Sequence, residues 1–265
     1  MEKPPASKKA RVDILLVERG LVPSRERARA LILAGRVLVR EQKVDKPGTT
    51  VPAESPIRLL GDDQPYVSRG GLKLAEALRF WQIPIAGRAC IDVGTSTGGF
   101  TDCLLQHGAA QVTAVDTGFG QIAMKLRNDP RVRLFERTNA RFLEPGALAA
   151  EKGSLEPTLL VMDVSFISAT LLLEPVFAAA PSIHEAVILV KPQFEAGREH
   201  VGKGGIVRDP EAHQLAIDKV ASCVRSLGWQ VVETIPSPIT GAEGNREFLL
   251  YARRPQPDGL AGAGA

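Results

Sequence analysis

Four charged residues stand beside apolar stretches of the sequence, where a charge normally needs a partner. Asp163 follows an apolar run in MDVSF, and Lys191 follows another in LVKPQFE. Lys73 lies in RGGLKL, and Glu247 precedes the last apolar run in GNREF. A charge beside an apolar strand is costly unless it forms an ion pair or takes part in chemistry. Each could be a solvated loop charge, but Asp163 and Lys191 end predicted strands, where open α/β sheets bind ligands.

A glycine-rich turn, DVGTSTGGF, occupies residues 92–100. It is not a dinucleotide fingerprint, because GxGxxG would need glycine where Ser96 stands. It is not a phosphate-binding P-loop, because Phe100 occupies the position of the essential lysine. What remains is an acidic residue, Asp92, before a turn whose glycines allow close backbone approach. A carboxylate at this position suits a ligand that carries an amino group.

A second acidic residue, Asp116, ends the next apolar run, twenty-two residues after Gly94. This position suits the ribose hydroxyls of a nucleoside. An amine-bearing nucleoside without phosphates is S-adenosylmethionine, and we predict this cofactor. A structural glycine turn and an NAD-like ligand are the alternatives. The predicted cofactor contacts are Asp92, Gly94, Thr95, Gly98, Gly99, Asp116 and, for adenine, Asn139.

Strand-like and helical patterns alternate after residue 70. Such alternation predicts an α/β fold, with a mostly parallel sheet and helices on both faces. We predict a Rossmann-like sheet of seven strands, whose last two strands can form an antiparallel edge. The strands are predicted at 89–93, 112–115, 132–135, 159–162, 186–190, 231–235 and 248–252. Helices are predicted at 72–80, 99–106, 169–179 and 211–227, with a partly helical stretch at 119–126.

The N-terminal part of the chain is basic. Residues 1–62 carry 13 Lys and Arg against 8 Asp and Glu, a net charge of +5. A modest positive patch attracts polyphosphates, but a solvated face has the same composition. The pattern predicts a helix capped by Asp13, a helix capped by Ser24, strands at 37–39 and 57–60, and a turn at 51–52.

The segment LVERGLVPSRERARALILAGRVLVREQKVDKPGTTV resembles the small RNA-binding domain of the fourth small-subunit ribosomal protein. The resemblance implies that a basic second helix and the following strand line one RNA-binding surface. Such a surface grips phosphates and reads RNA shape more than base sequence. The matching positions are Arg11, Ser24, Arg25, Arg27, Arg29, Arg36, Arg40 and Lys43.

A polar, turn-rich stretch at 61–65 predicts the domain boundary. We therefore expect an RNA-binding domain at 1–62, a linker at 63–68 and a catalytic domain at 69–254. The Pro-, Gly- and Ala-rich residues 255–265 are expected to form a disordered tail.

Six motifs of the sequence together resemble those of the TlyA family: YVSRGGLKL, DVGTSTGGFTD, MDVSFIS, VKPQFE, KGGIVRD and GNREF. The charged set on a methyltransferase fold also resembles the FtsJ-type RNA ribose 2′-O-methyltransferases. The match runs from about residue 11 to residue 253. It implies methyl transfer from S-adenosylmethionine to a ribose 2′-OH of ribosomal RNA in one or both subunits, with cytidine as the nucleoside. The implied catalytic set is Lys73, Asp163, Lys191 and Glu247.

Within this set we expect Lys191 to activate the 2′-OH. Burial, or a nearby cation such as Lys73, helps a lysine to lose its proton and act as a base. Asp163 and Glu247 are expected to orient the lysines and the hydroxyl. Arg69, close to the predicted boundary, is a candidate RNA contact that couples RNA docking to the active site.

Several classes of protein lack support in the sequence. No run approaches the eighteen apolar residues of a membrane helix, and the charged N-terminus lacks the apolar segment of a secretory signal. We therefore expect a cytoplasmic protein. The three cysteines, 90, 103 and 223, are too widely spaced for a disulfide framework or a metal site, and the four histidines do not cluster.

Three alternative functions stay open at this point. One is a membrane-active hemolysin, a name that TlyA proteins also carry. Another is a non-catalytic RNA-binding protein of ribosome assembly. The third is methylation of a base or a protein, which the DVSF that follows the fourth strand disfavours, because amino-group methyltransferases carry Asn/Asp-Pro-Pro-Tyr/Phe there. The oligomeric state and the modified nucleotide are not predicted.

Overall fold

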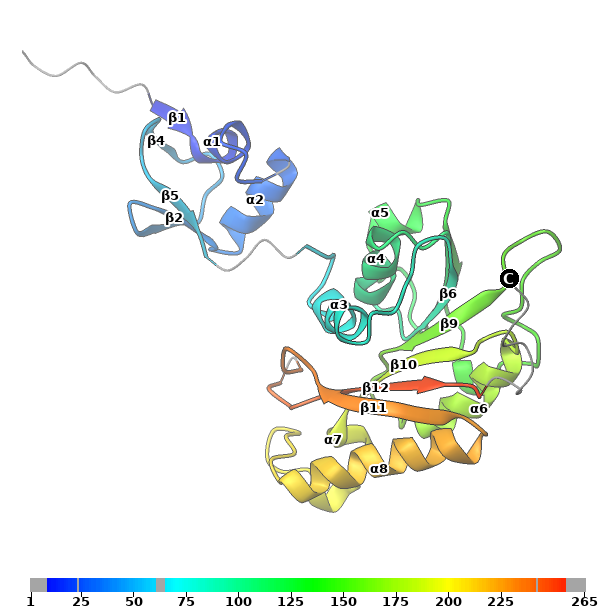
Figure 1. Cartoon of the computed structure of the whole chain (residues 1–265). Coiled ribbons are helices and arrows are strands. Elements are labelled where there is room, and N and C mark those ends of the chain that lie inside the picture. Colours follow the sequence, from blue (N-terminus) through cyan, green and yellow to red (C-terminus); the bar gives the residue numbers. More distant parts are fainter. Residues whose placement is uncertain (1–8, 23, 61–64, 242, 256–265) are drawn as a thin grey trace, which may run out of the picture. The chain divides into compact units, whose positions relative to one another are not determined.

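The computed structural model describes residues 9–22, 24–60, 65–241 and 243–255. The chain divides into two compact units, Met1–Gln64 and Pro65–Ala265 (Figure 1). Residues 256–265 of the predicted tail and 63–64 of the predicted linker lie outside the described residues, and the rest of that linker belongs to the second unit.

The N-terminal unit packs two helices against short strands. Their apolar faces share one core that includes Leu16, Ile32 and Val37. In the described residues the strands form a two-stranded sheet, β1–β4, and a three-stranded sheet in the order β3–β2–β5. The elements are β1 Lys9–Arg11, α1 Val12–Glu18, α2 Arg25–Leu33, β2 Val37–Val39, β3 Gln42–Val44, β4 Thr50–Pro52 and β5 Ile57–Leu59.

Two local predictions for this unit are wrong, and one is confirmed. Asp13 does not cap α1. It lies within the first turn of that helix, and its buried carboxylate forms ion pairs with Arg11 and Arg25. Residues 51–52, predicted as a turn, belong to β4, which pairs with the unpredicted strand β1. Ser24 does cap α2, since its Oγ accepts a hydrogen bond from the backbone N–H of Arg27 at 3.2 Å.

The second unit is built on a seven-stranded sheet within the described residues, which confirms the predicted fold class. Its strand order is β11–β12–β10–β9–β6–β7–β8; β12 pairs antiparallel with β11 and with β10, and the other neighbouring strands pair in parallel. Each predicted strand is present at nearly the predicted position. The strands are β6 Ala89–Val93, β7 Gln111–Val115, β8 Val132–Phe135, β9 Pro157–Met162, β10 Glu185–Val190, β11 Gln230–Pro236 and β12 Phe248–Arg253.

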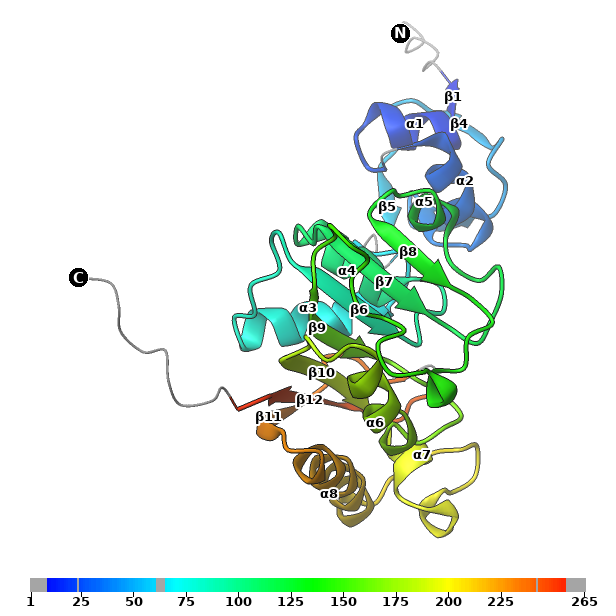
Figure 2. The same ribbon diagram turned by 90° about the vertical axis from the view of Figure 1, so that its right-hand side faces the viewer.

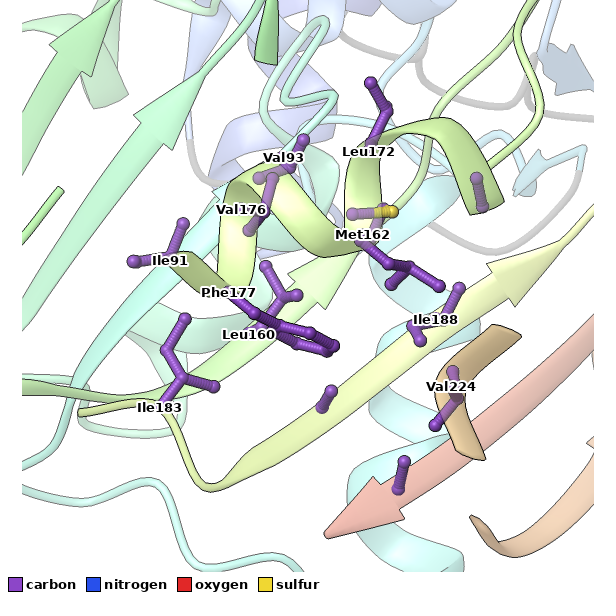
Figure 3. Packing of buried hydrophobic residues seen from close by; sticks show 14 of the residues in the cluster. Ile91, Val93, Leu160, Met162, Leu172, Val176, Phe177, Ile183, Ile188 and Val224 are labelled. Carbon is purple, nitrogen blue, oxygen red and sulfur yellow. The ribbon is translucent and has the colours of Figure 1, made fainter. Parts of the chain in front are cut away.

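Helices cover both faces of this sheet (Figure 2). One apolar cluster joins α3 and α4 to one face, and another joins α6 and α8 to the opposite face. Figure 3 shows the second cluster, where Val176 and Phe177 of α6 lie over Ile91 and Leu160 of the strands. The helices are α3 Gly70–Phe80, α4 Gly99–Gln106, α5 Met124–Arg127, α6 Thr170–Ala179, α7 Pro192–Glu195 and α8 Pro210–Ser226, with short 3₁₀ turns at Ala140–Phe142 and Arg198–His200.

The strand order determines where a ligand can bind. From β6 the chain continues outward to β7 and β8, and it then returns to the other side of β6 as β9 and β10. The carboxyl ends of β6 and β9 therefore flank the point where the order reverses, which is the usual ligand crevice of such sheets. The start of antiparallel β12 lies at the same edge, because Phe248 pairs with Val190 at the end of β10.

Candidate active site

The four charged residues singled out in the sequence meet at this edge of the sheet. Lys73 Nζ lies 2.5 Å from Glu247 Oε2 and 4.0 Å from Asp163 Oδ2. Lys191 Nζ lies 2.6 Å from Asp163 Oδ1, an ion pair without good hydrogen-bond alignment, and donates a hydrogen bond to Ser165 Oγ at 2.7 Å. The side chains thus form a continuous series in which carboxylates and ammonium groups alternate.

Each member of the series comes from a different element. Lys73 lies near the start of α3, and Asp163 directly follows β9. Lys191 directly follows β10 and is the N-cap residue of α7. Glu247 directly precedes β12, and its carbonyl oxygen accepts a hydrogen bond from Ser237 N at 2.8 Å. Secondary structure alone does not bring these residues together, so the site depends on the completed sheet.

The electrostatics of the series favour charged side chains in a buried place. Lys73, Lys191 and Glu247 are each less than a tenth exposed. Burying a charge is costly unless an opposite charge and hydrogen bonds compensate for it. Two cations and two anions in alternation satisfy that condition. Asp163 lies between the two lysines and is closer to Lys191 than to Lys73, whose nearer partner is Glu247.

A cavity of about 520 Å³ opens beside this series at the carboxyl ends of β6, β7 and β9. Of the predicted cofactor residues, Gly94, Asp116 and Asn139 line it, and Asp163 and Ser165 line it from the side of the charged series. Thr95, Gly98 and Gly99 do not belong to its lining. The cavity therefore reaches the charged series but uses only part of the glycine turn.

A side chain at Gly94, Gly98 or Gly99 of the turn would collide with other protein atoms. A Cβ on Gly94, whose φ is +86°, would lie 2.3 Å from the carbonyl oxygen of Asp163. A Cβ on Gly98, whose φ is +98°, would collide with Leu126, and one on Gly99 would lie 2.4 Å from Ser68 Oγ. Gly94 thus permits β6 and β9 to end close together, whereas Gly98 and Gly99 permit packing against α5 and the start of α3.

Asp92 lies beneath the cavity and does not line it. The carboxyl group is fully buried, and its Oδ2 accepts a hydrogen bond from Thr101 Oγ1 at 2.6 Å, while Oδ1 has no hydrogen-bond partner. Burial raises the pKa of Asp92 to about 7, and the Thr101 hydrogen bond opposes this rise only in part.

Asp116 lies at the cavity wall with two backbone partners. Its Oδ2 accepts a hydrogen bond from Ser96 N, and its Oδ1 accepts one from Gly118 N, each at 2.7 Å. A carboxylate oxygen has a second lone pair, so both oxygens can still accept a hydroxyl group. Asn139 caps the short 3₁₀ turn by accepting a hydrogen bond from Arg141 N at 3.0 Å.

Sequence reasoning missed Phe166, the most exposed aromatic residue at the rim of the cavity. Its side chain is 92% exposed, its φ of +65° is unusual for a bulky residue, and its ring centroid lies 5.5 Å from that of Phe194. The signal was present in MDVSF, where an aromatic residue follows the strand-end Asp163 by three positions. No role was assigned to Phe166 from the sequence, because periodicity does not separate a rim residue from a core residue.

The basic residues predicted to bind RNA differ in their partners. Arg11 and Arg25 both form ion pairs with Asp13, at 2.9 and 3.0 Å, while Arg36 Nε donates a hydrogen bond to the carbonyl oxygen of Leu60 at 2.8 Å. Arg29 and Arg40 are exposed, and the end of the Lys43 side chain lies against Gly35. Arg69 belongs to the other unit and donates a hydrogen bond to the carbonyl oxygen of Thr240 at 2.9 Å.

Comparison with known proteins bears directly on this site. Residues 66–254 match the FtsJ-like methyltransferase family, and residues 10–57 match the S4 domain. The chain belongs to the FtsJ-like methyltransferase family. It also carries an S4 domain, so the resemblances that the sequence suggested are confirmed.

Relatives match the FtsJ-like chain over nearly its full length. The 16S/23S rRNA (cytidine-2′-O)-methyltransferase TlyA of Mycobacterium tuberculosis is 44% identical, covering 97% of this chain and 95% of its own length. YqxC of Bacillus subtilis is 47% identical over 94% of this chain and 87% of its own. A solved structure from Streptococcus thermophilus, named as a hemolysin, has a TM-score of 0.70 at 41% identity and covers 96% of this chain and 92% of its own.

In the described part of this FtsJ-like chain, every helix is too short or too polar to span a membrane. In the same residues, no group of three or more His, Cys, Asp or Glu side chains is arranged to hold a metal ion.

Proposed function

We propose that this protein is an S-adenosylmethionine-dependent methyltransferase that modifies a ribose 2′-OH of ribosomal RNA. One observation carries the proposal: the alternating series of Glu247, Lys73, Asp163 and Lys191 lies against a cavity large enough for a nucleoside, on an FtsJ-like fold. The TlyA relative of M. tuberculosis, named for this reaction, supports the same assignment.

The cavity residues fit the cofactor. Asp116 has free lone pairs at the position where a ribose would present its hydroxyls, and Asn139 lies beside it for the adenine. Asp163 is the second carboxylate at the cavity wall. We assign to it the amino-acid end of the ligand, because Asp92 is fully buried and does not line the cavity. S-adenosylmethionine supplies a methyl group on a positively charged sulfur, which leaves as a neutral thioether.

Lys191 is the group that we assign to the proton of the 2′-OH. Its Nζ contacts Ser165 Oγ, an exposed hydroxyl at the cavity rim, so a substrate hydroxyl can reach the same nitrogen. As the ribose oxygen bonds to carbon, its proton must pass to a base, and Lys191 must enter this step as the neutral amine. Lys73 then carries the positive charge that holds Asp163 in place, and Glu247 holds Lys73.

The RNA contacts follow from the S4 domain and from Phe166. The exposed arginines of the N-terminal unit can grip phosphates without reading sequence. Phe166 offers an exposed aromatic face at the cavity rim, on which an unstacked base can lie while its ribose faces Lys191. We extend the cytidine preference of the M. tuberculosis relative to this chain as part of the proposal.

The test uses purified protein, methyl-labelled S-adenosylmethionine and separated ribosomal subunits that lack the modification. We expect labelling of a ribose 2′-O of cytidine, mapped by nuclease digestion and mass spectrometry. Lys191→Ala should slow methyl transfer by roughly 10²-fold or more at saturating substrate, with cofactor affinity nearly unchanged.

Lys152→Ala removes an exposed lysine that precedes β9, whereas the site residue Asp163 follows that strand; this variant serves as the control and should retain full activity. Normal turnover by Lys191→Ala would remove the role assigned to Lys191. Label on a base or on a protein would overturn the proposed reaction itself.

A further inference from the structure

A buried carboxylate outside the charged series, Glu195, connects two loops of the site. It ends α7 and is only 5% exposed. Its Oε1 accepts a hydrogen bond from Ala169 N at 2.7 Å, and its Oε2 accepts one from Ser168 Oγ at 2.5 Å. The Nζ of Lys219 in α8 lies 3.1 Å from Oε2 and also donates to the carbonyl oxygen of Glu195 at 3.1 Å. Three elements therefore converge on one side chain.

The two loops that Glu195 joins carry the groups assigned to the methyl acceptor. One is the loop from β9 to α6, residues 163–169, which includes Asp163, Ser165 and Phe166. The other is the segment from Lys191 to Glu195, which follows β10. The Phe166–Phe194 ring contact is a second connection between the same two loops. Glu195 thus fixes the position of the loop that holds Asp163 relative to the segment that holds Lys191.

Glu195 also completes the start of α6. The N-cap residue of that helix is Ala169, which has no side chain able to cap it. A carboxylate at a helix N-terminus satisfies a free N–H and interacts favourably with the helix dipole. Glu195 supplies this cap from a distant part of the sequence, so the start of α6 and the end of α7 are held at a hydrogen-bonded distance.

We propose that Glu195 is a positioning residue for methyl transfer: it sets the distance between the Asp163–Phe166 loop and Lys191. This inference rests on the proposed function. Apolar packing could stabilise the same two segments, but it would not fix their separation by directed hydrogen bonds. Because small misplacements of reacting groups reduce rates steeply, the loss should appear in the rate of the chemical step.

The experiment compares Glu195→Ala, Glu195→Gln and Lys219→Met in the full-length protein. Glu195→Ala removes the bonds to Ala169 and Ser168 and should lower the single-turnover rate at least tenfold, with the dissociation constant for S-adenosylmethionine within about threefold of wild type. Glu195→Gln keeps an acceptor for Ala169 N and should recover most of that rate. Lys219→Met leaves both loop contacts in place and should lower the melting temperature with a rate within about twofold of wild type.

A second readout does not depend on activity. Amide hydrogen exchange of residues 163–169 should become faster in Glu195→Ala and stay near wild type in Lys219→Met. Glu174→Gln, on the exposed side of α6, is the matched control and should change neither readout.

Equal rate losses in Glu195→Ala and Lys219→Met at equal loss of melting temperature would overturn the inference, because a purely structural role predicts that pattern. Unchanged exchange in Glu195→Ala would overturn it as well. If Glu195→Ala does not fold, the comparison of Glu195→Gln with Lys219→Met decides: a slower Lys219→Met refutes the positioning role. Absence of methylation by the wild-type protein would instead count against the proposed function.

Discussion

Glu247→Gln should destabilise the second unit, because Glu247 is the near partner of a buried lysine. The charged atoms of Glu247 and Lys73 lie 2.5 Å apart, whereas the next carboxylate, that of Asp163, lies 4.0 Å from Lys73. A hydrogen bond between charged groups contributes about 1.5–3 kcal/mol. Glutamine keeps the shape and an acceptor but loses the charge, so we expect a loss of about 2 kcal/mol in the free energy of unfolding.

Lys73→Met should cost more, because it leaves the Glu247 carboxylate buried without its partner. Within the described residues, Lys73 is the only cation that pairs with Glu247. Removing one member of a buried ion pair costs about 3–5 kcal/mol. The double variant should lose less than the sum of the two single losses, by about 1.5 kcal/mol or more, since it leaves neither charge unpaired.

The assay is urea unfolding followed by tryptophan fluorescence. Both tryptophans, Trp81 and Trp229, lie in the second unit, so the signal reports that unit alone. Glu76→Gln is the control on the same helix, since its ion pair is with the exposed Arg79 and should contribute less than about 0.5 kcal/mol. Losses that add within about 0.5 kcal/mol in the double variant would refute the reasoning, because an energetically coupled pair cannot behave additively.

Three further outcomes are expected. The pKa of Asp92, about 7 when folded, is above its ordinary value, so the folded protein keeps a proton that the unfolded chain releases between about pH 4 and pH 7. Stability should therefore fall as pH rises through this window, and Asp92→Asn should raise the urea midpoint more at pH 8 than at pH 5. Gly241→Ala should lower kcat with little change in cofactor affinity, because the new Cβ would lie 2.6 Å from Glu247 Oε1; an unchanged kcat would show that the carboxylate can move freely. Arg11 and Arg25 lower the pKa of Asp13 to about 2, so the N-terminal unit should lose stability as pH falls from about 4 to 2, and Asp13→Asn should flatten that loss in amide NMR signals of α1 and α2.

The sheet and the charged series could be predicted because each leaves a local signature. Strands buried on both faces read as short apolar runs, and a charge directly after such a run marks a strand end. All four charges of the series were singled out beside apolar stretches, and the family resemblance then implied that they form one catalytic set. The contacts among them could not be predicted, since they depend on the side-by-side order of β9, β10 and β12.

Other features left no usable signature. In the N-terminal unit, β1, β3 and β4 each carry a single apolar residue besides proline, so they were not predicted, whereas the predicted β2 and β5 carry at least two. The glycines of the turn could be recognised from the sequence as positions of close backbone approach, but the atoms that each one approaches could not be predicted. Gly98 and Gly99 contact helices that lie elsewhere in the chain, and this follows only from packing.

The contact between Lys73 and Glu247 joins residues that lie 174 positions apart in the chain. It closes only when β12, the last strand, has been inserted between β10 and β11. A chain that has folded as far as β10 already holds the cavity residues, Asp163 and Lys191, yet lacks the carboxylate that anchors Lys73. The charged series is therefore complete only when the last strand of the chain has taken its place in the sheet, so the site unites the first helix of the second unit with its last strand.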